Sequence, residues 1–288
     1  MAKQPENHQD PDTTGHSWDG IEEFNNPLPR WWVWIFYATI IWGIWYTIAY
    51  PAWPGIKGAT AGYLGFSTRG EVAADINAVN EANAPKNDKL ASVELASIAD
   101  DAELKGYAVS SGAAVFKTWC AQCHGSGAQG FKGYPNLQDD DWLWGGSMEA
   151  IHETITIGIR SPDHEDTRIN DMGAYGRDEL LEKEEIEQVV NYVMSLSGEA
   201  KDASLVAAGA VVFEDNCSSC HAEGGVGDQD QGAPNLADAI WLYGGDYDSV
   251  KETVYNGRSG VMPNWDTRLS EAQIRAVTTY VHQLGGGE

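Results

Sequence analysis

Two copies of one five-residue pattern give this chain its chemistry. Cys-x-x-Cys-His occurs at residues 120–124 and again at residues 217–221. This is the pattern at which c-type haem is attached, because two thiols can add to the two porphyrin vinyl groups and the adjacent histidine can bind the iron. The two copies use all 4 cysteines of the chain, so we expect two covalently bound haem c groups. The expected thioether residues are Cys120, Cys123, Cys217 and Cys220, and the expected proximal iron ligands are His124 and His221.

Other uses of the four cysteines fit the residues less well. A thioredoxin-like dithiol requires a βαβ setting and has no histidine after its second cysteine. A zinc site would have to bring together two cysteine pairs that lie about 97 residues apart in the chain. It would also leave both histidines unexplained.

An electron-transfer haem needs a second axial ligand that stays bound, and a methionine thioether opposite histidine raises the reduction potential. Met262 is the expected ligand in the second predicted haem domain, which contains no other methionine. In the first predicted haem domain, Met172 holds the corresponding place. Met148 aligns with Tyr247 in the repeat and so is not the shared ligand, and Met194 is assigned to packing. Three other histidines are alternative axial ligands: His164, His152 and His282. His164, which lies in a loop, is the main alternative to Met172.

The residues around the two motifs repeat as well, which predicts two copies of one structural unit. Gly-Tyr-Pro-Asn-Leu at 133–137 recurs as Gly-Ala-Pro-Asn-Leu at 232–236. Trp-Leu-Trp-Gly-Gly at 142–146 recurs as Trp-Leu-Tyr-Gly-Gly at 241–245. We therefore expect two tandem haem domains, at 104–199 and 203–288.

Helical patterns close each predicted domain. Apolar residues recur on one helical face at 186–193 and again at 274–284. Ser270 and Gln273 predict a capping box at the start of the second of these helices. Because strand signals are sparse, the sequence predicts a mainly α fold.

The segment Trp31–Tyr50 has no formal charge and the length that a helix needs to cross a bilayer. Tryptophan and tyrosine gather at both of its ends, as in interfacial belts. A cleavable signal peptide fits poorly, because the preceding residues are acidic and the apolar run is too long. We expect a transmembrane anchor at 30–52 behind a disordered or peripheral tail at 1–29. A linker at 53–103, helical near 71–81 and 91–101, would follow.

Haem chemistry orients this anchor. Covalent c-type haem is attached outside the cytoplasmic membrane, so the haem domains are expected in the periplasm and the tail at 1–29 in the cytoplasm. The expected location is therefore the bacterial inner membrane, crossed once.

The charge of the chain limits its partners. The net charge is -25, from 43 acidic and 18 basic residues. This excludes a general nucleic-acid binder, which needs positive charge, and favours a basic protein partner or solubility in salty surroundings. Three acidic clusters are candidate docking faces: Asp139–Asp141, Glu182–Glu187 and Asp228–Asp230.

The segment Asp19–Trp32, which ends in Pro-Leu-Pro-Arg-Trp-Trp, and the double haem region resemble the dihaem subunit of cbb3-type cytochrome c oxidases over nearly the whole chain. The resemblance implies an electron-transfer subunit that is not itself an enzyme. It would pass electrons from a donor cytochrome c towards a monohaem c subunit and the haem–copper catalytic subunit. There, oxygen is reduced to water and protons are pumped. One departure is Gly173 after Met172, where proline is more usual.

The two haem domains resemble class I cytochromes c. That resemblance implies that the carbonyls of Pro135 and Pro234 accept the ring N–H of the axial histidines. It also implies that the first and last helices of each domain pack through a glycine and two aromatic residues. The residues at those positions are Gly112, Phe116 and Tyr192 in the first domain, and Gly209, Phe213 and Tyr280 in the second.

Two other functions remain as alternatives. A dihaem peroxidase would leave one iron without a fixed sixth ligand, and the two candidate methionines argue against it. A membrane-anchored cytochrome c could instead serve another periplasmic oxidoreductase, such as a dehydrogenase or nitric oxide reductase. Only the resemblance of the Pro-Leu-Pro-Arg-Trp-Trp segment argues against this second alternative.

Overall fold

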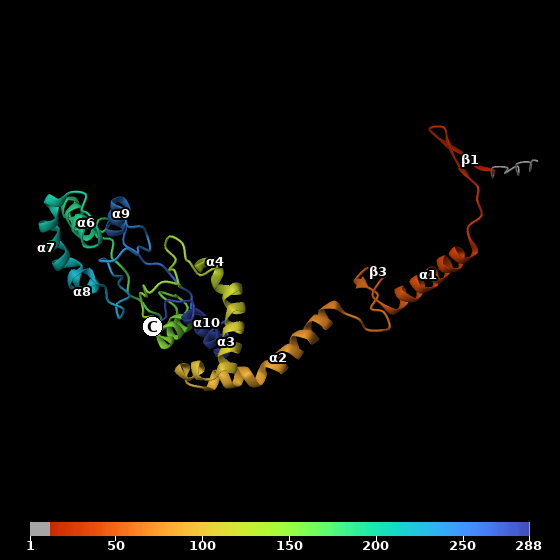
Figure 1. Cartoon of the computed structure of the whole chain (residues 1–288), viewed down its shortest axis with the longest axis horizontal. Helices are drawn as coiled ribbons and strands as arrows, with labels where there is room; N and C mark the ends of the chain where they lie inside the picture. The colour runs from red at the N-terminus through yellow and green to blue at the C-terminus, as the bar shows by residue number, and fades with distance from the viewer. Residues whose placement is uncertain (1–11, 288) are drawn as a thin grey trace, which may run out of the picture. The chain divides into compact units, whose positions relative to one another are not determined.

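A computed structural model describes residues 12–287, and the chain divides into two compact units between Asn80 and Glu81. The structure is mainly helical, as predicted (Figure 1). The α-helices are α1 (Arg30–Ala49), α2 (Thr68–Ser92), α3 (Ala102–Val115), α4 (Ala121–His124), α5 (Met148–Ile157), α6 (Lys183–Ser197), α7 (Val206–Asn216), α8 (Ser218–His221), α9 (Tyr247–Asn256) and α10 (Glu271–His282). The shorter elements are β1 (Thr13–Trp18), β2 (Ile21–Phe24), β3 (Pro54–Gly55), β4 (Gly58–Ala59), the 3₁₀ turns η1 (Leu95–Asp100), η3 (Ala203–Leu205) and η4 (Glu223–Gly225), and the π-helical turn η2 (Phe116–Cys120).

The tail contains a β-hairpin that the sequence analysis missed. Strands β1 and β2 pair antiparallel, with Trp18 opposite Ile21 and the dipeptide Asp19-Gly20 as the turn. Both turn residues have positive φ, 51° and 81°, which is the backbone that tight hairpins require and that Asp-Gly favours. Of the two expectations for the tail, disorder is corrected for these residues, whose side chains are all exposed, while residues 1–11 lie outside the described part of the chain.

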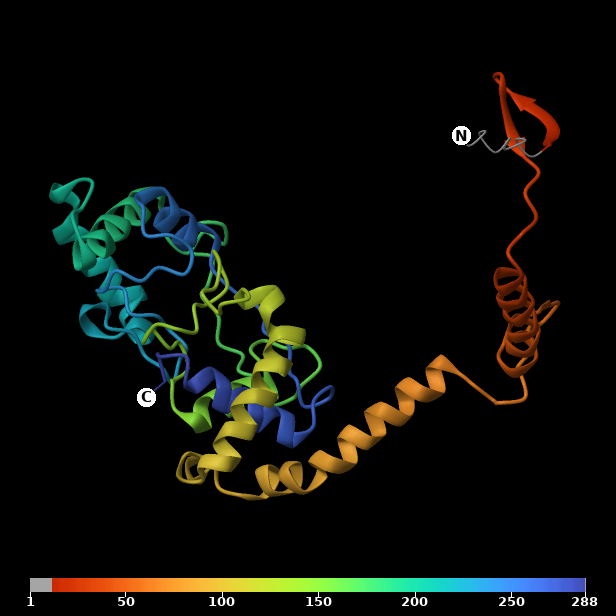
Figure 2. The same cartoon turned by 45° about the vertical axis from the view of Figure 1, so that its right-hand side comes forward.

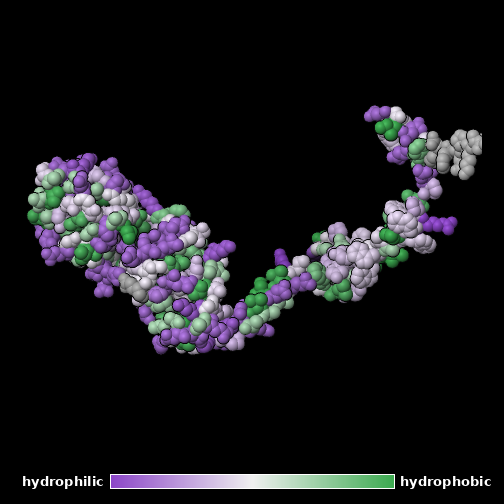
Figure 3. Space-filling model, in the orientation of Figure 1, coloured by the Kyte–Doolittle hydropathy of each residue, from purple (hydrophilic) through white to green (hydrophobic). Residues whose placement is uncertain are grey.

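Helix α1 is the apolar helix that the sequence predicted. It has 20 residues, an 18-residue stretch of it has a mean hydropathy of 1.4, and it is the one helix in residues 12–287 that is long and apolar enough to span a membrane. Tyr50 leaves the helix in an extended conformation, because the proline that follows it disfavours helical backbone. Figure 3 colours this segment pale to green, since tryptophan and tyrosine lie near the middle of the hydropathy scale.

The predicted linker packs at its C-terminal end. The helix expected near 71–81 lies inside the longer α2. Most of the stretch at 91–101 is helical as well, in the end of α2 up to Ser92 and in the 3₁₀ helix η1. Leu90 and Ile98 are fully buried in a cluster that also contains Ala276 of α10. This cluster attaches the end of α2 to the unit that carries both Cys-x-x-Cys-His motifs.

The helices of the two repeats pair crosswise. Helix α3 of the first repeat lies along α10 of the second, whereas α6 of the first repeat lies along α7 of the second (Figures 1 and 2). We define the outer module as residues 102–169 with 260–287, and the inner module as residues 170–259. The structure thus differs from the expectation that 104–199 and 203–288 each close on themselves.

Each module has its own core, built from both repeats. In the outer module, Phe116 packs with Val277 and Val281 of α10. In the inner module, Phe213 packs with Val189 and Val193 of α6.

The α3–α10 and α6–α7 interfaces are built in the same way, and this equivalence allows the helices of the two repeats to exchange partners. A Cβ on Gly112 would lie 2.1 Å from the carbonyl oxygen of Ala276, and one on Gly209 would lie 2.0 Å from that of Gln188. Only glycine allows these helices to approach so closely. The aromatic pairs match as well, with ring centroids 5.4 Å apart for Phe116 and Tyr280 and 5.1 Å for Tyr192 and Phe213. Since the interfaces are equivalent, the short connection at 198–205 favours α7 as the neighbour of α6.

The helix starts follow local sequence signals. The capping box predicted from Ser270 and Gln273 is present at α10, and it satisfies N–H groups that a helix start leaves unpaired. A second capping box, between Glu182 and Glu185, starts α6. Both fix the beginning of a helix that closes a cavity.

Candidate haem-binding sites

The outer module encloses a cavity of about 490 Å³. Cys120, Cys123 and His124 line one part of it, and Met262 lines another together with Trp265. The remaining wall is largely apolar and includes Ile151, Ile155, Val277 and Val281. The first haem motif thus shares a cavity with the methionine of the second repeat.

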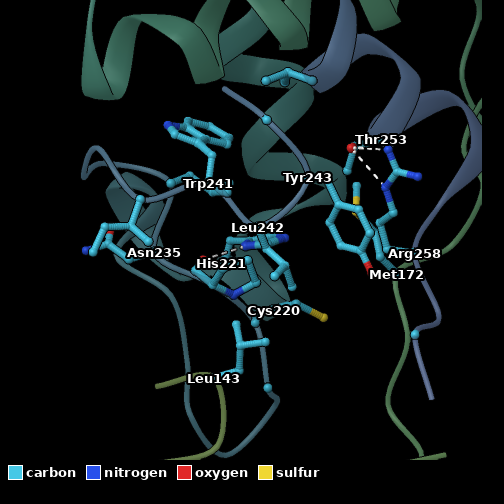
Figure 4. A pocket seen from close by; sticks show the side chains of 18 of the residues that line it. Leu143, Met172, Cys220, His221, Asn235, Trp241, Leu242, Tyr243, Thr253 and Arg258 are labelled. Atoms are coloured by element: carbon cyan, nitrogen blue, oxygen red, sulfur yellow. Dashed lines mark hydrogen bonds between the residues drawn. The ribbon is translucent and has the colours of Figure 1, made fainter. Parts of the chain in front are cut away.

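The inner module encloses the corresponding cavity, of about 690 Å³. It is lined by Cys217, Cys220 and His221 of the second motif and by Met172 of the first repeat. Figure 4 shows His221 and Met172 on different sides of the cavity, with Leu242 and Tyr243 also projecting into it. Both volumes lie in the range of cofactor pockets, roughly 300–1,000 Å³.

The two motif histidines are held in the orientation that iron ligation requires. Nδ1 of His124 lies 3.0 Å from the carbonyl oxygen of Pro135, and Nδ1 of His221 lies 3.0 Å from that of Pro234. These are the proline contacts that the resemblance to class I cytochromes c implied. Because a carbonyl oxygen can only accept, Nδ1 must donate, and the lone pair of each ring is on Nε2.

Burial keeps these imidazoles in the neutral form that binds metals. It lowers the pKa of His124 and of His221 below the usual range, although the hydrogen bond to proline acts in the opposite direction. A lowered pKa leaves Nε2 unprotonated at neutral pH.

The cysteines lie beside the histidines on one short helical turn in each module. Burial, with a smaller contribution from the second thiol, raises the pKa of Cys120 and of Cys217 to about 11. Both free thiols are therefore protonated at neutral pH. Cys120 ends the π-helical turn η2, a geometry that is uncommon and frequent at functional sites.

Each candidate methionine is fixed by a two-bond backbone bridge. Met262 exchanges N–H···O bonds of 2.9 Å with Ile159, and Met172 exchanges bonds of 2.9 and 3.0 Å with Arg258. A glycine with positive φ precedes each partner, Gly158 at 72° and Gly257 at 70°. A Cβ on either glycine would lie within 2.5 Å of the methionine carbonyl oxygen. The departure at Gly173 does not remove Met172 from the cavity wall.

The structure corrects the pairing of methionines with motifs. The sequence analysis placed Met172 with His124 and Met262 with His221, since each pair belongs to one repeat. The structure places Met262 with His124 and Met172 with His221, because the loop of each methionine precedes the helix that packs in the other module. The two remaining methionines pack: Met148 against the Leu90 cluster, and Met194 in the inner core.

The alternative histidine ligands lie away from both cavities. His152 is 3.1 Å from a carboxylate oxygen of Glu271, and His164 is 3.4 Å from one of Asp266. His282 also lines neither cavity.

The comparisons with known proteins identify the family of the chain. Residues 10–57 match the family described as the N-terminal domain of cytochrome oxidase-cbb3, FixP. Residues 108–193 and 204–281 match the family described as cytochrome c oxidase, cbb3-type, subunit III. This chain belongs to the family of subunit III of cbb3-type cytochrome c oxidases. The prediction made from the Pro-Leu-Pro-Arg-Trp-Trp segment and the double motif is confirmed.

Individual members of the subunit III family are similar along their whole length. The chain is 59% identical to the cbb3-type cytochrome c oxidase subunit CcoP of Cereibacter sphaeroides, over 97% of this chain and 96% of that protein. It is 54% identical to CcoP of Rhodobacter capsulatus over the full length of both chains. It is 51% identical to subunit FixP of Azorhizobium caulinodans, over 96% and 94% of the two chains.

Membership in the subunit III family establishes the role of the chain. It is an electron-transfer cytochrome c subunit of a respiratory oxidase and not the catalytic subunit, as the sequence predicted. The peroxidase and the cytochrome serving another oxidoreductase are not favoured. The apolar helix α1 lies within the matched N-terminal region, which indicates attachment to the membrane.

The wall between the two cavities is a feature that the sequence analysis did not assign. Residues of both modules line both cavities: Tyr134, Pro135, Asn136, Asp141, Leu143, Arg160, Gly232, Leu242, Tyr243 and Gly260. Two arginines stack on aromatic rings of the Trp-Leu-aromatic-Gly-Gly segments: Arg168 lies 4.8 Å from the ring centroid of Trp144, and Arg258 lies 4.2 Å from that of Tyr243. The repeated Trp-Leu-aromatic-Gly-Gly segments marked these aromatic residues in the sequence. Their position beside the cavities depends on how the two modules pair.

Proposed function

We propose that the chain holds two covalent haem c groups, each with histidine–methionine ligation across the exchanged modules. The observation that carries this is the content of the cavities. Each unites a Cys-x-x-Cys-His motif, a histidine oriented by a proline carbonyl, and a methionine loop fixed by a backbone bridge. The outer haem would be held by Cys120 and Cys123 between His124 and Met262. The inner haem would be held by Cys217 and Cys220 between His221 and Met172.

The bound haems supply reversible one-electron chemistry at iron. The residues of this chain fix the two axial ligands and surround the porphyrin with apolar side chains. They also keep the two sites next to each other across one shared wall. We propose that electrons pass from a donor cytochrome c through the two haems to a monohaem c subunit. From there they would reach the haem–copper subunit that reduces oxygen to water while the complex pumps protons.

We propose a single-pass topology in the bacterial inner membrane. Residues 1–29 would be a cytoplasmic tail, 30–52 the anchor and 53–103 a periplasmic linker, with the repeats at 104–199 and 203–288 in the periplasm. The apolar helix α1 and the extracytoplasmic attachment of haem c support this orientation. A reporter fused before residue 1 should be protected from protease added to the periplasm. Cleavage of that reporter in intact spheroplasts would contradict the topology.

The acidity of the chain predicts how the donor reaction responds to salt. With a net charge of -25, a donor with a basic face should be attracted, and such steering raises association rates by about ten- to a thousandfold at low ionic strength. Salt at roughly 0.1 M shortens the reach of these charges to about 10 Å. We therefore expect stopped-flow reduction by a basic cytochrome c to slow steeply as salt rises.

The reaction also provides its own control. Electron transfer between the two haems is intramolecular and should change little over the same range of salt. Charge reversal within the clusters at 139–141, 182–187 and 228–230, one at a time and at fixed salt, should identify the face that meets the donor. A donor reaction with the same rate at low and high salt would show that the acidity serves solubility instead.

A further inference from the structure

Arg160 occupies a position that no other basic residue among residues 12–287 shares. It lines both cavities, whereas Arg258 lines the inner cavity alone and Arg268 the outer cavity alone. It follows Ile159, whose backbone forms the bridge to Met262. Its φ is +51°, a left-handed conformation that is uncommon for residues other than glycine and that concentrates at functional sites.

The guanidinium of Arg160 binds the loops of both candidate methionines. Its Nε donates a hydrogen bond of 2.6 Å to the carbonyl oxygen of Gly260, two residues before Met262. Its Nη1 donates to the carbonyl oxygen of Asn170, two residues before Met172. Because the guanidinium is planar and rigid, one side chain fixes the distance and orientation between the two loops.

The charge of Arg160 is also shared between the sites. Burial lowers the pKa of Arg160, and the nearby Tyr243 and Asp171 act in the opposite direction. Arginine nevertheless stays protonated in proteins. A fixed positive charge at the wall between two haems favours the reduced form of both, since reduction removes one positive charge from each iron.

We infer that Arg160 is a positioning residue common to both haem sites: it holds the loops of Met172 and Met262 together and raises both reduction potentials by its charge. This inference rests on the histidine–methionine ligation proposed above. It gives the exchanged modules a functional link, because a change at one residue reaches both irons.

Two variants of the full-length dihaem protein test this role. Arg160→Gln removes the charge and the fork of donors, while Arg160→Lys keeps the charge and loses the fork. We expect Arg160→Gln to lower both potentials in a spectroelectrochemical titration. We also expect imidazole to displace the thioether more readily at both haems, by on the order of tenfold in affinity, since each loop loses one hydrogen bond to a charged donor. Arg160→Lys should keep both potentials nearer those of the parent and still show the weaker resistance to imidazole.

Matched controls separate a shared role from a general loss of charge. Arg258→Gln should affect the inner haem alone and Arg268→Gln the outer haem alone. The two haems are told apart by which potential falls in Met172→His and in Met262→His. A change confined to one haem in Arg160→Gln, or no change at either, would overturn the inference. Failure of the proposed ligation would show differently, as a parent protein without the far-red iron–thioether band at either haem.

Discussion

Replacing Met262 by histidine is expected to lower the potential of the haem attached to Cys120 and Cys123, and to leave the haem attached to Cys217 and Cys220 unchanged. The reason is the exchange of modules, which places Met262 in the cavity of the first motif. A histidine ligand stabilises the oxidised iron more than a thioether does. The shift should be a substantial part of the roughly 0.8 V range that axial ligands set.

The assignment requires that each haem be observed alone. In a Cys217→Ser and Cys220→Ser background, the one remaining covalent haem belongs to the first motif. In that background Met262→His should shift the measured potential and abolish the far-red iron–thioether band, while Met172→His should do neither. The reverse is expected in a Cys120→Ser and Cys123→Ser background. If Met172→His instead shifts the haem of the first motif, each repeat provides its own ligand and the exchanged arrangement is incorrect.

Truncation of the chain after Ser259 is expected to remove the outer haem site and spare the inner one. The missing residues contain Met262, Trp265 and α10, which form half of the outer core. The inner module is continuous in sequence from residue 170 to 259 and keeps both its axial ligands and its α6–α7 contact. The truncated protein should therefore retain one low-spin haem with a thioether ligand, attached at Cys217 and Cys220.

Peptide mapping and redox titration check this outcome. Peptide mapping of the truncated protein should give a haem peptide that contains Cys217 and Cys220. Redox titration should give one high potential, and the spectrum should show the far-red band of one iron–thioether bond. Truncation after Leu284 is the matched control, because it leaves α10 complete and should preserve both potentials. Recovery of an intact thioether-ligated haem at Cys120 and Cys123 after truncation at Ser259 would mean that the first repeat closes on itself.

Local sequence determined the parts of this protein that depend on neighbouring residues. The two Cys-x-x-Cys-His motifs, the apolar helix of Arg30–Ala49 and the capping box at Ser270 are each encoded within a few residues or one continuous segment. The resemblance also foresaw the proline contacts of the two histidines, because each proline follows its histidine by only 11 or 13 residues. The hairpin at Asp19-Gly20 is also encoded locally: the Asp-Gly dipeptide is a hairpin turn signal, although the sequence analysis did not predict the hairpin.

Tertiary structure alone decided which parts meet. Gly112 in the α3–α10 interface and Gly209 in the α6–α7 interface occupy equivalent positions. Each faces a tyrosine, Tyr280 and Tyr192 respectively. Two pairings of such helices make nearly the same local contacts, so composition and periodicity cannot distinguish them. The choice depends on the length and path of the connections between the helices. That choice sets which methionine faces which histidine, and it places Arg160 between two methionine loops that belong to different repeats.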